Sequence, residues 1–395
     1  MLESITGLTD LWHAFRSMLG KGIAEAIALT LFCFIVLVLK KFWSFIRSFI
    51  DRFYRLKRAL NDVARDTSSI WPQEGRGLWL IEPIKPPEIV VNYNTPPARI
   101  LVVGNAKGGV GKTTVAANVA ACLAENADRP VLLIDLDFQG SASSMSIIGE
   151  ENWLPPPGQD SKASYLLSGD LSDAHVATLD KHATARKNGQ ITIIPNLKVV
   201  TAYYDLAQAE NRVMVEWLLS DRKNDIRFHL TRLLHSDAVR RAYSLIVVDC
   251  PPRLTTGTIQ ALAAGTHLLI PTILDGPSRE AVVTFVRQIE AFRDRGLCSN
   301  LQHIGVVATM VDSKANLQRE ELQLRERLNL SRDSGGAGGV TTLLPESTYI
   351  PDSASFRHAA GHGIAYYVMG DGQAVASVKN AIRSLAELVR QEMKL

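Results

Sequence analysis

Closely spaced metal-binding residues are missing from this sequence. The four cysteines, Cys33, Cys122, Cys250 and Cys298, lie far apart and form neither a C-x-x-C pair nor a cluster with histidine. This excludes a zinc or iron–sulfur site that spacing could identify, and it provides no disulfide framework. We therefore expect the main body of the chain to lie in a reducing compartment.

A surplus of positive charge is missing from most of the chain. Residues 1–70 hold ten of the 43 lysines and arginines and six of the 40 aspartates and glutamates, which leaves 33 basic and 34 acidic residues beyond them. A domain with a large nucleic-acid footprint is expected to be basic itself. DNA binding by the body of the chain is therefore possible but not favoured by charge.

One long apolar run is present near the N-terminus. The segment Gly22–Leu39 has eighteen residues and a single ionisable group, Glu25. As a helix it measures roughly 27 Å, enough to cross the hydrocarbon core of a bilayer. The run is long for a signal peptide, and no small-residue cleavage site follows it. The alternative is a buried core helix in a small N-terminal domain.

The charges beside this run predict its orientation. Two basic residues, Arg16 and Lys21, precede it, and seven follow between Lys40 and Arg58. The positive-inside rule places the chain after Leu39 in the cytoplasm. We therefore expect a single-pass protein of the cytoplasmic (inner) membrane.

Two further segments separate this span from the body. Residues 42–60 have aromatic and aliphatic residues at helical spacing with a basic opposite face, which predicts an amphipathic helix that either lies on the anionic inner surface or packs against other helices. Residues 71–98 contain six prolines and predict an extended, semi-rigid linker. The expected organisation is a membrane segment (1–70), this linker and a cytoplasmic domain (99–395).

The body alternates short apolar runs with helix-like segments. Such β-branched and leucine-rich runs suit strands that are buried on both faces, which predicts an α/β fold with a doubly wound, mostly parallel sheet. Ligands in such folds bind at the carboxyl ends of the strands. The expected strands are Ile100–Gly104, Val131–Asp135, Leu245–Asp249, His267–Ile273 and Ile304–Val311.

A glycine-rich loop, KGGVGKTT, follows the first of these strands. Its glycines allow backbone N–H groups to wrap around phosphate oxygens, and the next helix adds its positive N-terminal end. Lys112 is placed to reach the β- and γ-phosphates, and the Thr113 hydroxyl to ligate Mg²⁺. The general template for such loops has glycine where this chain has Ala106. The expected nucleotide contacts are Lys107, Gly108, Gly109, Val110, Gly111, Lys112, Thr113 and Thr114.

The narrower pattern K-G-G-x-G-K-T-T resembles the ParA/MinD family of deviant Walker A ATPases. Four later motifs continue the resemblance in the same order, so that it spans residues 99–395. It implies a P-loop NTPase domain with ATP and Mg²⁺ as cofactors and a homodimer in the ATP state. The four motifs are VLLIDLDFQG, YSLIVVDCPPRL, TMVDSKANL (309–317) and IPDSASFRHAAGHGI (350–364).

The resemblance also implies roles for individual residues. Lys107 would cross the dimer interface to the partner's phosphates, as an arginine finger does. Asp137 would position the attacking water, and Lys107, Lys112 and Asp137 would form the catalytic set. Asp135 and Asp249 would join Thr113 around Mg²⁺.

Two further positions follow from the same comparison. Met310 and Pro351 belong to the segments that border the adenine in this family. Phe138 stands where the family usually has proline, which leaves the rate of hydrolysis open.

Features that the sequence lacks exclude some subgroups of this family. Without paired cysteines the chain does not resemble the iron–sulfur carriers, and without a C-terminal tyrosine cluster it does not resemble the membrane-anchored tyrosine kinases. Residues 161–205 look most like partition-type members, which bind DNA through surface basic residues. Arginines that could serve this purpose are Arg279, Arg287, Arg293, Arg357 and Arg383.

These observations predict a membrane-anchored, ATP-dependent dimerisation switch. It would hydrolyse ATP slowly, be stimulated by a protein partner that the sequence does not identify, and recruit or position that partner. Two alternatives stay open: a DNA-partition ATPase whose N-terminal helix is a packing element, and a nucleotide-binding scaffold with negligible turnover.

Overall fold

The computed structural model describes most of the chain in two compact units, Met1–Asn61 and Asp62–Leu395. Parts of the predicted linker (71–76 and 90–94) and residues 313–316 of the predicted adenine-bordering segment lie outside the described residues. The described residues are 13–14, 17–18, 20–68, 77–89, 95–149, 154–155, 158–169, 179–220, 224–312, 317–333, 341–370 and 372–395.

The N-terminal unit is built on one helix, α2 (Lys21–Ser68), which is 48 residues long. It includes both the predicted span and the predicted amphipathic helix, with no break between them. By length and composition, the stretch Glu25–Arg58 qualifies as a candidate membrane span. None of its most apolar window is buried, so the alternative of a buried core helix is wrong for the N-terminal unit as described.

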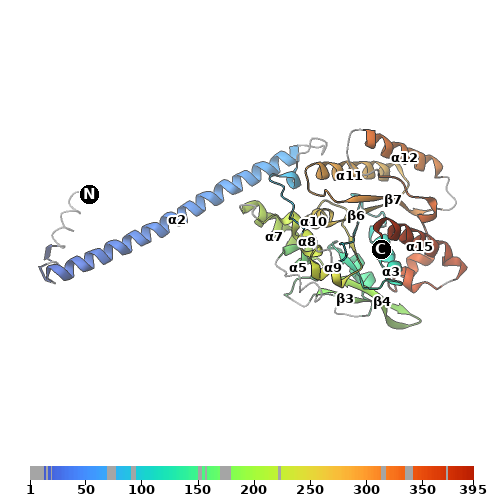
Figure 1. Ribbon diagram of the computed structural model, residues 1–395, viewed down its shortest axis with the longest axis horizontal. Coiled ribbons are helices and arrows are strands. Elements are labelled where there is room, and N and C mark those ends of the chain that lie inside the picture. Colours follow the sequence, from blue (N-terminus) through green and yellow to red (C-terminus); the bar gives the residue numbers. More distant parts are fainter. Residues whose placement is uncertain are drawn as a thin grey trace. The chain divides into compact units, whose positions relative to one another are not determined.

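The second unit contains an eight-stranded sheet in the order β3-β4-β2-β5-β1-β6-β7-β8 (Figure 1). Every neighbouring pair is parallel except β3 and β4, which are antiparallel. The expected α/β fold with a mostly parallel sheet is therefore confirmed. The strands are β1 (Ile100–Val103), β2 (Val131–Asp135), β3 (Lys181–Lys187), β4 (Gln190–Val200), β5 (Leu245–Asp249), β6 (His267–Thr272), β7 (Gln302–Val311) and β8 (Ile350–Pro351).

Helices cover both faces of this sheet, and alternate residues of the central strands supply the two cores. In β1, Ile100 and Val102 belong to one apolar cluster and Leu101 and Val103 to the other. The first cluster packs under α5 (Lys162–Ser168), α7 (Asp205–Leu219), η5 (Ile226–Phe228), α8 (His229–Leu234), α9 (Asp237–Ala242), α10 (Thr256–Ala264), α11 (Gly276–Asp294) and α12 (Gln318–Asp333). The second packs under α3 (Lys112–Ala124), α4 (Ser141–Ser146), α13 (Ala354–Ala360), α14 (Ala365–Val368) and α15 (Gln373–Met393).

Three central strands end together at one edge of the sheet. Asp249, the last residue of β5, pairs in register with Val103 of β1 and with Asp135 of β2. The glycine-rich loop leaves β1 at this edge and enters α3. The topology therefore gathers the predicted nucleotide-binding residues at the carboxyl ends of parallel strands, where α/β folds bind ligands.

Candidate nucleotide-binding site

The loop between β1 and α3 has a backbone that only glycine adopts easily. Gly109 and Gly111 have φ values of 73° and 77°, in the left-handed region. A Cβ atom at Gly111 would also lie 3.5 Å from the Thr309 Cβ. The backbone conformation therefore favours glycine at these two positions. Helix α3 begins directly after the loop, at Lys112.

Contacts with the strands β6 and β7 brace this loop. The amide of Asn105 donates to the carbonyl of Pro271 over 2.8 Å, and its oxygen accepts from the Lys107 N–H over 3.1 Å. The Thr309 hydroxyl lies 2.9 Å from the Val110 carbonyl and 3.0 Å from that of Thr272. The loop is therefore held in shape by β6 and β7, because these contacts fix both of its ends.

Lys112 points into the protein rather than into solvent. Its side chain is buried, and its Nζ donates to the Lys107 carbonyl over 2.8 Å. Burial lowers the pKa of Lys112, and the charges of Asp249 and Asp137 oppose this shift. The ammonium therefore lies next to the carboxylates at the strand ends, in the position that the sequence predicts for a phosphate-facing cation.

The carboxylates of Asp135 and Asp249 are both fully buried but differ in their surroundings. Asp135 Oδ2 accepts from the Ser143 hydroxyl (2.7 Å) and N–H (2.8 Å), and its Oδ1 accepts from the Asp137 N–H (3.0 Å). Burial raises the pKa of Asp135 to about 6 despite these hydrogen bonds. Neither oxygen of Asp249 makes a hydrogen bond of good geometry among the described residues, although the Thr113 hydroxyl is close enough to influence its pKa.

The electrostatics of Asp249 favour a cation. Burial, followed by the charge of Asp135, raises the pKa of Asp249 well above its ordinary value, while the Thr113 hydroxyl and the Lys112 charge oppose the shift. Buried carboxylate oxygens without donors are what a Mg²⁺ shell requires. Thr113 and Asp249 therefore fit as holders of Mg²⁺, whereas Asp135, whose oxygens already accept hydrogen bonds, fits an outer supporting position.

The described residues contain no group of three or more histidines, cysteines, aspartates or glutamates placed to hold a metal ion by themselves. Mg²⁺ in nucleotide sites needs no such group, because substrate phosphates and waters complete its shell. The arrangement around Asp249 is consistent with a metal that depends on the nucleotide.

Asp137 and Phe138 begin a tight turn after β2. The Gly140 N–H donates to the Asp137 carbonyl over 2.8 Å, and Gly140 has a φ of 63°. Phe138 packs against the first apolar cluster, with its ring centroid 6.3 Å from that of Tyr204. The turn thus closes with phenylalanine in place of proline, and the Asp137 carboxylate contributes to the pKa shifts of Lys112 and Asp249.

A cavity of about 180 Å³ opens beside the loop. Met310 and Pro351 line it together with Gly111 and Thr114, so the structure brings the two predicted adenine-bordering residues to the glycine-rich loop. Met310 has a φ of 52°, an uncommon conformation for methionine. Contact of Met310 and Pro351 with adenine stays a prediction. The other lining residues are Val115, Thr309, Ile350, Asp352, Ser353, Phe356 and Arg357, and all of them except Val115 belong to the two later motifs at 309–317 and 350–364.

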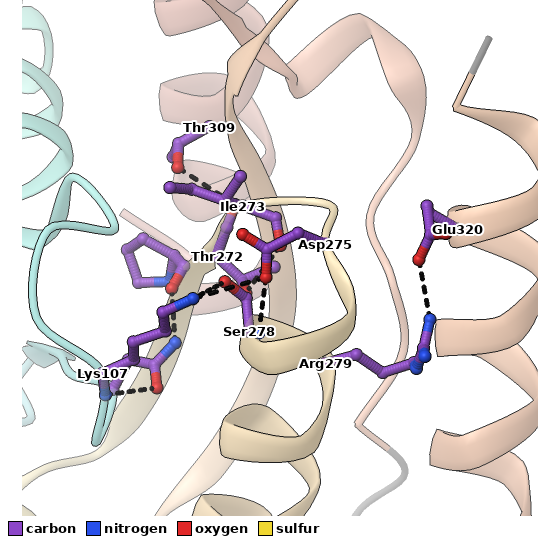
Figure 2. A network of polar contacts seen from close by, with 10 residues as sticks. Lys107, Thr272, Ile273, Asp275, Ser278, Arg279, Thr309 and Glu320 are labelled. Atoms are coloured by element: carbon purple, nitrogen blue, oxygen red, sulfur yellow. Dashed lines mark hydrogen bonds and ion pairs between the residues drawn. The ribbon is translucent and has the colours of Figure 1, made fainter.

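The side chain of Lys107 contacts the start of α11 (Figure 2). Its Nζ donates to the Ser278 hydroxyl over 2.7 Å and to Asp275 Oδ1 over 3.3 Å. Asp275 caps α11 by accepting from the Ser278 N–H. Partial burial raises the pKa of Asp275, but hydrogen bonds from Ser278 and Lys107 outweigh it and lower that pKa overall. The sequence analysis missed both partners, although an aspartate two residues before Pro277 is a recognisable helix start.

Four of the five arginines suggested for DNA contact have partners within the chain. Arg279 pairs with Glu320 over 2.7 Å (Figure 2). Arg293 donates to the Leu301 carbonyl, and Arg357 pairs with Asp352. Arg383 donates to the Tyr366 hydroxyl over 3.3 Å.

Known proteins share this sequence pattern and fold. An AAA domain family model matches residues 98–303, more than half of the chain. The chromosome partitioning protein ParA of Myxococcus xanthus is 34% identical over 225 residues, 57% of this chain and 69% of the relative. The sporulation initiation inhibitor protein Soj of Bacillus subtilis is 34% identical over 219 residues, 55% of this chain and 75% of the relative.

Among solved structures, cobyrinic acid a,c-diamide synthase from Mycobacterium smegmatis, with a bound ATP analogue and magnesium, has a similar fold. Its TM-score is 0.51 at 24% identity, and the match covers 75% of this chain and 96% of that one. The family match, the ParA and Soj relatives and the glycine-rich loop at the carboxyl edge of the sheet agree with one another. This chain belongs to the ParA/MinD-like family of P-loop ATPases.

Proposed function

We propose that this protein is a membrane-anchored ATPase that dimerises when it binds ATP and recruits or positions a protein partner according to its nucleotide state. The observation that carries the nucleotide part is that buried Lys112 and buried Asp249 lie within electrostatic reach of each other at the glycine-rich loop. Bound phosphate would supply acceptors to Lys112 and the loop amides, and a divalent cation would coordinate the Asp249 oxygens.

Each residue then has a role in phosphoryl transfer. The loop amides and the N-terminal end of α3 bind the phosphates, and Lys112 neutralises their charge. Thr113 and Asp249 hold Mg²⁺, which shields the phosphate oxygens when it is bound. Asp135 fixes the Asp137 N–H, and the Asp137 carboxylate orients the attacking water. The resulting hydrolysis is slow, because a single subunit supplies no second cation at the phosphates.

The second cation would come from a partner subunit. Lys107 must leave Asp275 and Ser278 before it can reach another subunit's phosphates. The Lys107 and Asp275 side chains are 30% and 42% exposed, and exposed ion pairs contribute only about 0–1 kcal/mol. The contact is therefore weak enough for dimerisation to replace it.

The membrane part of the proposal depends on α2. Its apolar stretch is unburied within the described unit, and the basic residues that follow it would lie on the cytoplasmic side by the positive-inside rule. A surface-lying helix at 42–60 would require a bend near Leu39, and α2 is continuous there. The proposal therefore has α2 crossing the membrane and extending into the cytoplasm.

The size of the detergent-solubilised, full-length protein tests the switch. We expect ATP and Mg²⁺ to convert monomers into dimers in multi-angle light scattering, and ADP not to do so. Lys112→Ala should stay monomeric in both nucleotides. A wild-type protein with the same mass in ATP and in ADP would contradict the proposal.

A second candidate is DNA partition, favoured by the name of one relative, the chromosome partitioning protein ParA of Myxococcus xanthus. Most phosphate-driven DNA binding is steeply salt-dependent. The balanced charge of residues 71–395 predicts weak or absent binding. A clear gel shift by the ATP-bound protein that disappears with added salt would favour partition instead.

A further inference from the structure

Part of the predicted linker is docked on the ATPase domain. The segment Gly77–Pro83, here called the strap, contains the short helix η2 (Leu78–Leu80). Leu80 is 7% exposed and belongs to the same apolar cluster as Leu136 and Cys250, the residues directly after Asp135 and Asp249. The strap therefore packs into the same apolar core that Leu136 and Cys250 join.

A buried arginine holds the strap by its backbone. Arg227 is 1% exposed and donates to the carbonyls of Trp79 (2.8 Å), Ile81 (3.0 Å) and Pro83 (2.9 Å). Its remaining two N–H groups donate to Asp225 over 2.8 Å and 2.6 Å. All five donors of the guanidinium are thus used, three of them by the strap. Undocking would leave three buried donors without acceptors, so the strap is either docked or the site around Arg227 must rearrange.

Trp79 connects the strap to the loop that follows Asp249. Its indole N–H donates to the Leu254 carbonyl over 3.1 Å. Its ring stacks on Trp217, with centroids 6.4 Å apart and planes 11° from parallel, and the Arg227 guanidinium lies 5.0 Å from the Trp217 ring centroid. One side chain therefore contacts both the Asp249 loop and helix α7.

Helix α7 leads to the same loop by a second path. Glu210 lies two turns before Trp217 on this helix and is buried. Its Oε1 accepts from the Gly257 N–H over 2.7 Å, at the start of α10. The strap thus contacts residues 250–257 directly, through the hydrogen bond from Trp79 to Leu254, and indirectly, through helix α7 and its residue Glu210.

We propose that the strap is a positioning element of the ATPase site, which holds the loop Cys250–Thr255 behind Asp249 and thereby couples its own docking to ATP hydrolysis. Trp79 and Arg227 are positioning residues, since neither belongs to the nucleotide-binding set. The effect on turnover rests on the proposed ATPase function, whereas the effect on the loop does not.

Hydrogen–deuterium exchange on the full-length, nucleotide-free protein in detergent tests the positioning. Trp79→Phe keeps a ring on Trp217 and removes the donor to Leu254. Exchange in peptides covering residues 250–257 should become about threefold to tenfold faster, the range expected for one neutral hydrogen bond. Trp79→Ala should enlarge the effect. Trp43→Phe on α2 is the matched control and should leave these peptides unchanged.

ATPase kinetics test the coupling. Trp79→Phe should lower kcat several-fold while KM for ATP stays within about twofold, because the strap positions the loop and does not touch the phosphate site. Arg227→Lys, which keeps the charge but fewer donors, should lie between wild type and Trp79→Ala. Unchanged exchange at 250–257 in both Trp79 variants, or faster exchange throughout the sheet, would overturn the positioning role. Faster exchange at 250–257 with unchanged kcat would overturn the coupling.

The two proposals fail in different ways. A wild-type protein that does not hydrolyse ATP would contradict the proposed function, and the exchange experiment would still decide on the strap. Lys112→Ala should lose ATP binding and keep slow exchange at residues 250–257. Loss of that protection in Lys112→Ala would mean that the loop depends on the phosphate site rather than on the strap.

Discussion

The Nζ atom of Lys107 lies 3.3 Å from Asp275 Oδ1 of the same chain, at the capped start of α11. Figure 2 shows that this contact turns the lysine toward helix α11. The lysine that we propose to act on a partner subunit is thus held by its own subunit. Under that proposal, the strength of the contact between Lys107 and Asp275 sets how readily the dimer forms.

Weakening the contact between Lys107 and Asp275 should favour the dimer. Asp275→Asn removes the negative charge and keeps a residue that caps helices well. The ATP concentration at the midpoint of dimerisation should fall by up to about fivefold, the limit for an exposed ion pair. Light scattering over an ATP titration measures this. Asp237→Asn, at the start of the distant helix α9, is the matched control, and an unchanged midpoint in Asp275→Asn would contradict the prediction.

Lys112 and Asp137 should have separable roles. Lys112→Ala removes the buried cation and should abolish ATP binding. Asp137→Ala should leave binding intact, slow hydrolysis and trap the dimer, because only the positioning of water is lost. Fluorescent-nucleotide titration and phosphate release measure the two effects. An equal loss of affinity in both variants would show that the roles are wrongly assigned.

The buried carboxylates should make the nucleotide-free protein less stable as pH rises. The folded-state pKa of Asp135 is raised to about 6, so the folded state binds a proton more tightly than the unfolded one. Stability is then lost as pH rises from about 4 through 6, by about 3 kcal/mol at most for this shift. Burial also raises the pKa of Asp249, which acts in the same direction.

Asp249→Asn should remove part of this loss. Without nucleotide and Mg²⁺, we expect its Tm to exceed that of wild type by about 3 °C or more at pH 8, and the difference to shrink toward pH 4. Differential scanning calorimetry measures both proteins, with Asp237→Asn as an exposed control. A wild-type Tm that rises between pH 5 and 8 relative to Asp249→Asn would contradict the sign.

Membrane insertion should depend on the centre of the apolar run. The full-length protein should stay in the membrane pellet after alkaline carbonate extraction. Replacing Leu31 and Phe32 by arginine costs about 2.5–3.5 kcal/mol each at the centre of a span and should release the protein. Phe49→Arg, outside the predicted span, is the control. Recovery of the wild-type protein in the soluble fraction would disprove the anchor.

The site was predictable where the signal is local in sequence. Gly109, Gly111 and Lys112 belong to one short loop, and Asp135 and Asp249 end apolar runs, so spacing alone placed them at one sheet edge. The partners of Lys107 were not predictable, because Asp275 and Ser278 lie 168 and 171 residues away. Only the fold brings them together.

Contacts between residues far apart in the sequence also explain two other differences between the sequence-based predictions and the structure. Prolines correctly indicate a segment without long helices at 77–89, but its docking depends on Arg227, 148 residues beyond Trp79. Strands β3 and β4 were missed, because β3 carries charged residues at both ends and lacks an apolar run. Its stability comes from antiparallel pairing with β4, which composition does not report.

Action of Lys107 across a dimer is the most specific prediction. Lys107→Ala should bind ATP nearly as well as wild type, because Lys112, Thr113 and the loop amides remain, and it should lose ATP-induced dimerisation and hydrolysis. Mixed with Lys112→Ala chains, it can form a heterodimer in which its own nucleotide faces the intact Lys107 of the other chain. One composite site should then recover part of the activity. ATPase rate against mixing ratio at constant total protein measures this, with heterodimers verified by differently tagged chains. A flat rate at the level of the separate variants, with heterodimers present, would show that Lys107 acts only within its own chain.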